Sequence, residues 1–441
     1  MVSADNVNLD VLEHIFTYLA GNDLPSVALV SRSFFAGVIP RLYRTLLFRL
    51  SHAKRYPALM SPFSAIAAHP EFAIHVRHVD IRTVPVVKTQ CNPRFLLECA
   101  RAIALCSNIT SFRCSISNAL PPFLAALQQT DRLQRLRISA ALTTEQATRV
   151  VALSTIRHLT LDFASWNLMD LLPRWTAVLQ NNLTTLTLYM AHELNETVLE
   201  SALASLPGLL GLHVIGCPKV DHASLLALVT HTPNLESLSM TTGDPARPLP
   251  TPPNLLPHLH TLALDTRLPA APFPAPAPAP AAILAILAHL ASSLPPPRLA
   301  ALALKLPAAP PALIAQLIAA HGPTLRRVAL LDCALGTDSL AALSRACVRL
   351  ERLEVRVPVR DLTPFAHALA PARTLRTLVD ATPRTGPALA QTGVRHLFAR
   401  IPSLMTVVTG GRVWTRRTGL SIALERHPPH GAGVHWFMPR E

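Results

Sequence analysis

The residues of this chain whose type and spacing come closest to a metal-binding pattern are two pairs of histidines. His75 and His78 stand three residues apart, and His258 and His260 stand two apart. Two imidazoles so spaced could share a zinc ion, but a structural zinc site takes four ligands, commonly with cysteine thiolates among them. Asp80 follows the first pair, but no cysteine follows either pair closely. We therefore expect no metal site at these histidines.

The seven cysteines also lack a metal-binding pattern. None forms a C-x-x-C pair, and the odd count with long intervals is typical of reduced thiols in the cytosol or nucleus. We expect the cysteines to be small buried hydrophobes. Cys217 and Cys333 each come just after an expected strand. Asp221 and Asp338 follow them at four or five residues and are expected to cap the next helices.

Sequence motifs of catalysis and cofactor binding are missing. The chain has no G-x-x-x-x-G-K-[ST] or G-x-G-x-x-G loop for phosphate, and no H-E-x-x-H or G-x-S-x-G. We expect a protein that is not an enzyme, with no catalytic residue and no cofactor.

An apolar phrase, L-x-x-L-x-L, returns along most of the chain at intervals that are mostly 23 to 29 residues. Its copies are Val76/Val79/Ile81, Ile109/Phe112/Cys114, Leu133/Leu136/Ile138, Ile156/Leu159/Leu161, Leu183/Leu186/Leu188, Leu209/Leu212/Val214, Leu235/Leu238/Met240, Leu259/Leu262/Leu264, Leu299/Leu302/Leu304, Leu325/Val328/Leu330 and Leu350/Leu353/Val355, with degenerate copies at Leu375/Leu378 and Leu404/Val407. The last two apolar residues of each phrase alternate, as in a strand with one buried face. This period is that of leucine-rich repeats. It predicts an α/β fold: a solenoid over residues 75–411, with a curved parallel sheet inside and helices outside.

The repeat pattern has one long gap and one clear end. The gap contains a Pro/Ala-rich insertion at about 267–282, which favours extended polyproline II or, alternatively, a docking site for a proline-recognising domain. After Gly410-Gly411 the pattern stops, so residues 412–441 are expected to be a C-terminal cap or tail. Arg412–Thr415 could pair with Val407-Val408 and shield the edge of the last repeat. We expect Val434–Phe437 to cover the same edge.

The N-terminal residues indicate short amphipathic helices. Apolar residues recur at three- and four-residue steps in a first helix (Leu9, Leu12, Ile15, Phe16, Leu19) and in a second (Leu24, Val27, Val30, Phe34, Val38). Two helices of this length are not stable alone, so they need a third element or a partner.

This N-terminal region resembles an F-box of the fungal type. The resemblance covers about 40 residues and lies in Val7-Asn8-Leu9-Asp10-Val11-Leu12, Ile15-Phe16-Thr17-Tyr18-Leu19, Asp23-Leu24, Leu29-Val30-Ser31-Arg32-Ser33-Phe34 and Pro40-Arg41-Leu42-Tyr43-Arg44. It implies a three-helix module over residues 1–48, followed by a linking helical segment at 49–74. It also implies docking on the small adaptor subunit of a cullin-based (SCF-type) ubiquitin ligase. The adaptor-binding residues would be Val7, Leu9, Leu12, Ile15, Phe16, Leu19, Leu24, Val30 and Phe34.

The sequence departs from the family at its start, where Val7-Asn8 stands in place of Leu-Pro, and this puts the strength of adaptor docking in doubt. The alternative is a generic helical cap that shields the first repeat. The positions of Cys217 and Cys333 are similar to a cysteine-containing repeat subtype common beside F-boxes. This resemblance implies that both cysteines point inward and use backbone hydrogen bonds.

The formal charge of +14 raises the question of a nucleic-acid partner. Four of the 40 basic residues are lysines, which leaves 36 arginines and suggests a coding bias as much as a selected surface. Because side chains alternate along a strand, those that point away from the helices should include His213 and Ser239. The candidate target-binding residues of this set are Arg82, Arg113, Arg135, Arg137, Asp162, Tyr189, Asp265, Arg327, Arg352 and Arg356. Both ends of this row are basic and its centre is neutral to acidic. A phosphate-tracking stripe would be unbroken, so a protein target with separated acidic patches is favoured.

We expect neither a signal peptide nor a membrane span. Residues 1–10 are polar, and the most apolar stretch, 281–294, is shorter than the ~20 residues that cross a bilayer. The expected protein is therefore soluble and cytoplasmic, nuclear or both. It would be a substrate-recognition adaptor that binds the adaptor and cullin subunits through its helices and an unidentified target through its repeats. The alternatives are a protein-binding scaffold without a ligase and, less favoured, a basic nucleic-acid-binding protein.

Overall fold

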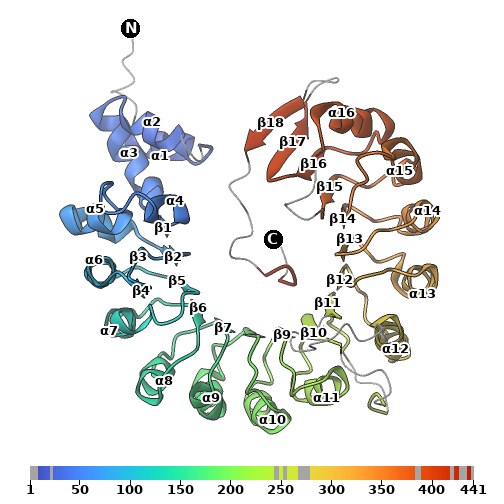
Figure 1. Ribbon diagram of the computed structural model, residues 1–441, viewed down its shortest axis with the longest axis horizontal. Coiled ribbons are helices and arrows are strands. Elements are labelled where there is room, and N and C mark those ends of the chain that lie inside the picture. Colours follow the sequence, from blue (N-terminus) through green and yellow to red (C-terminus); the bar gives the residue numbers. More distant parts are fainter. Residues whose placement is uncertain are drawn as a thin grey trace. The chain divides into compact units, whose positions relative to one another are not determined.

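The computed structural model describes residues 8–19, 23–242, 248–251, 256–266, 279–382, 389–417, 422–426 and 435–438. The chain forms two compact units, Met1–Thr185 (unit 1) and Leu186–Glu441 (unit 2). In each unit the strands lie side by side and the helices of the repeats line one side of the sheet (Figure 1). We call the side of the sheet that these helices leave uncovered the open face.

Unit 1 contains a parallel sheet in the order β1-β2-β5-β6-β7. Its strands are β1 (Thr45–Phe48), β2 (His78–Ile81), β5 (Ser111–Cys114), β6 (Arg135–Ser139) and β7 (His158–Asp162), and a separate two-stranded ribbon joins β3 (Val86–Val87) to β4 (Gln90–Cys91).

The helices of unit 1 begin with α1 (Leu9–Phe16), α2 (Asp23–Ala28) and α3 (Arg32–Leu42). The others are α4 (Leu50–Ala53), α5 (Pro62–Ala68), η2 (Pro70–His75), α6 (Pro93–Leu105), η3 (Pro121–Phe123), α7 (Leu124–Gln128), α8 (Thr144–Val151) and α9 (Trp166–Leu179), where η marks a 3₁₀ helix.

Unit 2 continues the strand–helix alternation, and its sheet follows the chain order from β8 to β18. The strands are β8 (Thr185–Tyr189, which begins at the last residue of unit 1), β9 (Gly211–Ile215), β10 (Ser237–Thr241), β11 (Thr261–Asp265), β12 (Ala301–Lys305), β13 (Arg327–Leu331), β14 (Arg352–Val355), β15 (Thr377–Asp380), β16 (Thr406–Thr409), β17 (Arg412–Arg416) and β18 (Ile422–Arg426). The helices are α10 (Glu196–Ala204), α11 (His222–Leu228), η4 (Val229–His231), α12 (Ala279–Ala291), α13 (Pro311–His321), α14 (Thr337–Ala346), α15 (Leu362–Leu369) and α16 (Gln391–Arg400).

Every copy of the apolar phrase coincides with a strand, from β2 at Val79 to β16 at Val407. The alternating leucines of the phrase are buried; Leu238 and Leu262, for example, are fully inaccessible. They pack between the sheet and the helices, which is why the phrase recurs once per repeat. The predicted α/β solenoid of leucine-rich repeats is thus confirmed.

The sequence reading missed β1, which pairs with β2 in parallel, so the sheet already begins at Thr45.

Side chains just before the strands tie neighbouring repeats together. Thr110 and Thr184 donate hydroxyl hydrogen bonds to the Arg77 and Arg157 carbonyls at 3.1 and 3.0 Å. Asn108 and Asn182 donate side-chain amide hydrogen bonds to earlier carbonyls in the same way. The Arg77 and Arg157 carbonyls also accept backbone N–H groups of the next repeat, so the two hydroxyls reinforce a junction that the backbone already makes. The Asn-x-Thr patterns at these sites therefore have a structural reason.

The other local predictions have mixed outcomes. Cys217 is buried, with its Sγ 3.7 Å from the Leu188 and Ile215 carbonyl oxygens, and the Asp221 side chain caps α11, as expected. Asp338 is not a cap, because Gly336 holds that position and Asp338 lies in the first turn of α14, where a carboxylate suits the helix dipole. The Pro/Ala insertion lies mostly outside the described residues, and its last residues, 279–282, are helical in α12.

The C-terminal hairpin is confirmed, but the end of the chain is not where we expected it. β17 pairs antiparallel with β16, and β18 then pairs with β17. Of Val434–Phe437, Val434 lies outside the described residues. His435–Phe437 does not cover this edge but lies on the open face near β8–β12. The physical reason is that Phe437 packs there in a buried apolar cluster with Ile215 and Ala263.

Removing one inter-repeat hydrogen bond should measurably weaken unit 1. Thr155 donates to the Leu133 carbonyl at 2.7 Å from a half-buried position. We expect Thr155→Val to lower the free energy of unfolding by about 1 kcal/mol, because the shape is kept and the bond is lost. Thr148, exposed on α8 and bonded only to Thr144 of its own helix, provides the control Thr148→Val. Equal urea midpoints for the two variants would contradict this role.

Candidate protein-binding surfaces

Helices α1, α2 and α3 pack around a small core of their own. Leu12, Phe16 and Val38 are buried there, with Phe16 and Phe34 rings 5.4 Å apart. Gly37 lets α3 approach α1 closely, since an added Cβ would lie 3.0 Å from the Phe16 ring. The core fixes which side of α1 faces inward: Leu12 and Phe16, four residues apart, share one face of the helix.

The side of α1 next to this buried face is apolar and exposed. Val11, Ile15 and Tyr18 follow one another at four- and three-residue steps, and Ile15 and Tyr18 are 50% and 78% exposed. Leu29 and Val30, after α2, are 88% and 63% exposed. We call these five residues the apolar stripe. An exposed apolar set of this kind is a common mark of a protein interface.

The adaptor-binding residues expected from sequence divide between the two sides. Leu12 and Phe16 lie in the core with 3% exposure each, so they are not available for direct contact, and this corrects their expected role. Leu19, Leu24 and Phe34 are partly buried against the same core. Leu9, Ile15 and Val30 are exposed, whereas Val7 lies outside the described residues. The sequence reading missed Val11 and Tyr18, whose four- and three-residue spacing to Ile15 was the available signal. It also missed Leu29, which follows α2 and has no such spacing.

The open face of unit 1 carries a linked set of charges. The strand register places Asp80, Arg113 and Arg137 side by side on β2, β5 and β6. Asp80 accepts from Arg82 at 2.8 Å and lies 3.7 Å from Arg113. Burial lowers the pKa of Arg113 to about 10, and Arg137 acts in the same direction, while Asp80 opposes it. The guanidinium therefore stays charged at neutral pH.

Asp162 takes part in the same face without being accessible. Its carboxylate is 2% exposed and accepts from Arg137 Nε at 2.8 Å. Asp162 therefore holds Arg137 in place and is not itself a contact residue, which corrects its expected role. Arg135, by contrast, is exposed on β6. Four of the five candidate residues in unit 1 are arginines, so this face suits an acidic partner.

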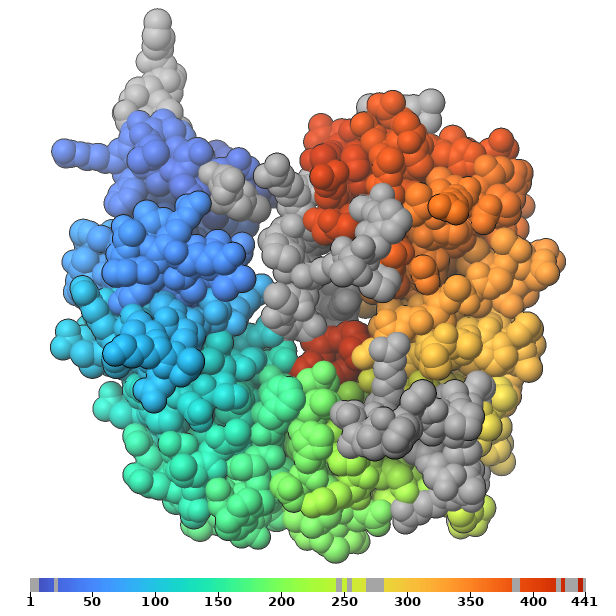
Figure 2. Space-filling view, in the orientation of Figure 1, coloured from blue at the N-terminus to red at the C-terminus, as the bar shows by residue number. Residues whose placement is uncertain are grey.

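The open face of unit 2 is covered at its centre. In β9, β10 and β11 every residue is buried, whereas β12 and β13 show the alternation of a strand with one free face. The cover is His435–Met438, which we call the C-terminal segment. It lies inside the curve of unit 2, and the space-filling view shows its dark red atoms against green-to-orange residues of that unit (Figure 1, Figure 2).

Aromatic contacts hold the C-terminal segment. Phe437 is 1% exposed and packs with Ile215 and Ala263 in one buried cluster. The His435 ring lies 4.2 Å from that of Tyr189, centroid to centroid. The Ser239 hydroxyl lies 3.4 Å from the Phe437 carbonyl oxygen. Because residues so distant in sequence meet here, the sequence alone gave no sign that His213 and Ser239 would be buried.

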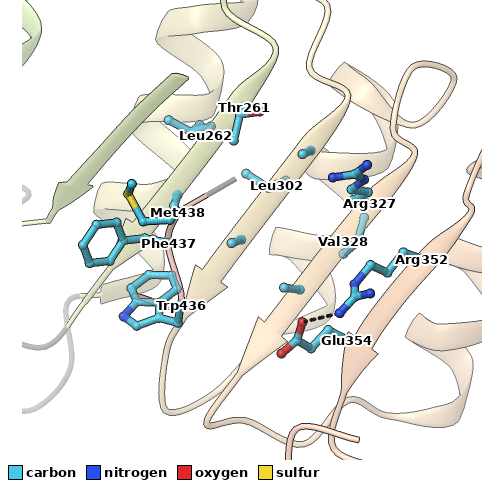
Figure 3. A pocket seen from close by; sticks show the side chains of 14 residues that line it. Thr261, Leu262, Leu302, Arg327, Val328, Arg352, Glu354, Trp436, Phe437 and Met438 are labelled. Carbon is cyan, nitrogen blue, oxygen red and sulfur yellow. Dashed lines mark ion pairs between the residues drawn. The ribbon is translucent and has the colours of Figure 1, made fainter. Parts of the chain in front are cut away.

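A pocket of about 80 Å³ adjoins the C-terminal segment (Figure 3). Trp436, Phe437 and Met438 form one side, and the strands β11 to β14 form the floor and the other side. Arg327, Arg352 and Glu354 stand along this far side, with Arg352 and Glu354 3.9 Å apart. The pocket is thus apolar near the segment and charged away from it.

The candidate target-binding residues of unit 2 differ in how exposed they are. Tyr189 is half-buried beneath His435, and Asp265 is 5% exposed with its carboxylate 3.7 Å from Lys305 Nζ. Burial gives Asp265 a structural part in holding Lys305, which corrects its expected contact role. Arg356 is exposed just after β14. Arg327 and Arg352 are the two that line the pocket.

The histidine pairs of the sequence do not come together with further ligands. Across the described ranges, no group of three or more His, Cys, Asp or Glu side chains is placed to hold a metal ion. His260, just before β11, instead lies 3.4 Å from Glu236, just before β10. In the same ranges, no helix has the length and apolar character needed to cross a bilayer.

His213 should make the stability of unit 2 sensitive to acid. It is 1% exposed, and burial, with His435 acting the same way, lowers its pKa from 6.5 to about 3. The unfolded chain therefore binds this proton more readily, so the stability contributed by His213 is complete above pH 6.5 and is lost as the pH falls toward 3. Between pH 7.5 and pH 5 the loss should reach about 2 kcal/mol.

His213→Asn isolates this effect, because its amide can replace the Nδ1 hydrogen bond with Ser239, which is 2.7 Å long. His289 and His321 also have lowered pKa values through burial, but they act equally in both proteins. Urea unfolding from pH 7.5 to 5 should show the wild type losing its advantage over the variant. A difference that stays constant with pH would refute the assignment.

Comparison with known proteins gives matches only among solved structures. No protein-family model matches the chain, and no curated protein matches it. A structure of the Rad7 and Elc1 complex in yeast is similar at 16% identity and a TM-score of 0.34, over 64% of this chain and 65% of that chain. A TLR13–ssRNA13 complex is similar at 14% identity and a TM-score of 0.31, over 76% of this chain and 54% of that chain. The chain spans less than two thirds of either neighbour's length.

Proposed function

We propose that this protein is the substrate-recognition subunit of a cullin-based ubiquitin ligase. In this proposal α1–α3 dock on the adaptor subunit, and the open faces of the repeats bind a target protein. The chain supplies no catalytic group, because its contribution is to hold the target near the transfer site. It would act in the cytoplasm, the nucleus or both.

The apolar stripe is the observation that carries the docking half of the proposal. Val11, Ile15, Tyr18, Leu29 and Val30 are exposed although the three helices already have a core. Fully burying one such side chain contributes roughly 1.5–3 kcal/mol, so leaving five exposed forgoes several kcal/mol unless a partner covers them. The resemblance to an F-box names the adaptor as that partner.

The cap hypothesis also has an observation in its favour. Phe35 and Tyr43 of the α3 region pack on Phe72 of η2, with ring centroids 6.1 and 4.7 Å apart. The helices are therefore attached to the start of the repeats, as a cap would be. A protein-binding scaffold without a ligase remains the second candidate, and adaptor binding distinguishes the two.

The target-binding half rests on the composition of the open faces. The arginines of unit 1 stand in ion pairs that hold them at the surface of the sheet. Such a face attracts an acidic protein surface, and charge complementarity mainly increases association rate and selectivity. In unit 1, the candidate contact residues that remain exposed or half-exposed are Arg82, Arg113, Arg135 and Arg137.

Replacing two residues of the apolar stripe should abolish adaptor binding. We expect Ile15→Asp with Val30→Asp to weaken binding of a purified adaptor–cullin complex at least 100-fold, because two carboxylates would be buried against an apolar surface. Surface plasmon resonance measures the affinity. Leu12→Asp is unsuitable as a test, since Leu12 lies in the core of the helices.

The matched control is Leu97→Asp on α6, where Leu97 is 53% exposed, close to the 50% of Ile15. This variant should keep full adaptor affinity. Thermal melting establishes that all variants are folded. Undiminished binding by the folded double variant, or no binding by the wild type, would exclude the ligase role and leave the scaffold.

A further inference from the structure

Small side chains form a shallow trough along the middle of the open face of unit 2. The strand register sets Ser239 beside Ala263, Ala263 beside Ala303, and Ala303 beside Ala329. His213, beside Ser239, continues the row on β9. Between the flanking rows, these small residues leave room for another chain to approach the sheet.

The C-terminal segment occupies this trough. Phe437 lies over Ala263 and Ala303 and is almost inaccessible to solvent. Its ring stands 5.8 Å from the ring of His213, and its carbonyl oxygen faces the Ser239 hydroxyl at 3.4 Å. An aromatic side chain and a backbone carbonyl thus both find partners in the floor of the trough.

Trp436 and Met438, on either side of Phe437 in the sequence, also contact side chains of the sheet. Lys305 Nζ lies 5.6 Å from the centre of the Trp436 ring, in cation–π geometry, and Asp265 holds the same ammonium group at 3.7 Å. On the other side, the Thr187 hydroxyl lies 3.7 Å from Met438 Sδ. Three consecutive side chains, Trp436, Phe437 and Met438, thus each contact a different part of the sheet.

The trough does not end where the C-terminal segment ends. The pocket beside Trp436 and Met438 continues over Ala303 and Ala329 toward Arg327 and Arg352 (Figure 3). A longer peptide could therefore follow the same floor and place an acidic side chain near these arginines.

We infer that the open face of β8–β13 is a peptide-binding groove, that its present occupant is the C-terminal segment, and that a partner segment with adjacent aromatic side chains competes for it. The segment is then an intramolecular competitor of the target. This deepens the target-binding half of the proposed function and does not depend on adaptor docking.

The short connection makes the competition strong. Eight residues, 427–434, separate β18 from the C-terminal segment. A tether of this length gives an effective concentration in the millimolar range. A free peptide that binds the empty groove with a dissociation constant of about 100 µM should therefore bind the full chain roughly tenfold more weakly.

The test uses a fluorescein-labelled synthetic peptide with the sequence of residues 431–441. Fluorescence anisotropy measures its binding to the full chain and to a chain that ends at residue 430. We expect binding to the shortened chain and at least tenfold weaker binding to the full chain. A peptide carrying Phe437→Asp should not bind either protein.

Ala303→Glu in the shortened chain should remove binding, because it places a carboxylate on the trough floor under Phe437. Ala342→Glu, at an exposed position of α14, is the matched control and should bind normally. Full-chain Phe437→Asp gives an independent route if the shortened chain does not fold, and it should bind the wild-type peptide. Three results would overturn the inference. The peptide could bind the full chain as tightly as it binds the shortened chain or full-chain Phe437→Asp, it could fail to bind these two proteins although they are folded, or Ala303→Glu could leave its affinity unchanged.

Discussion

In-register pairing of parallel strands is the constraint on which the rest of the structure depends. Each repeat hydrogen-bonds to the next so that equivalent positions stand side by side, as Leu238 stands beside Leu262 and Ser239 beside Ala263. Alternate side chains of each strand are buried beneath the helices, so they must be apolar. The side chains between them lie on the open face, where a residue type that recurs in successive strands forms a row across the sheet. Unit 1 has a row of charge, with Asp80, Arg113 and Arg137, and unit 2 has a row of small residues.

The repeats could be predicted because their cause is local. A leucine every second residue, returning once per repeat, marks the buried parity of a strand without knowledge of its partners. The hairpin at Arg412–Arg416 was predictable for a similar reason: Gly410-Gly411 supplies a turn with positive φ between two β-rich runs. β1 was missed although Tyr43, Leu46 and Phe48 have the spacing of the phrase, because these residues were assigned to the helical module at 1–48.

The sites were less predictable because their causes are not local. On α1, apolar residues occur on both sides of the helix, and only contact with Val38 decides that Leu12 faces inward and Ile15 outward. On β9 and β10, parity correctly places His213 and Ser239 on the open face. Their burial comes from Phe437, some 200 residues later in the chain, and nothing in the strand sequence encodes that contact. Asp162 and Asp265 likewise owe their burial to neighbouring strands.

Of the two apolar surfaces, the trough of unit 2 is covered and the apolar stripe is exposed, and this difference has a physical consequence. The trough in unit 2 is covered from within, so it avoids nonspecific association, and a partner must displace aromatic contacts already made. The apolar stripe of α1 and the segment after α2 has no such cover among the described residues, although Tyr18 and Leu29 are more exposed than most apolar side chains of the fold. An uncovered apolar surface can bind a partner without first losing internal contacts. The first surface is therefore suited to conditional, exchangeable binding, and the second to a standing partner.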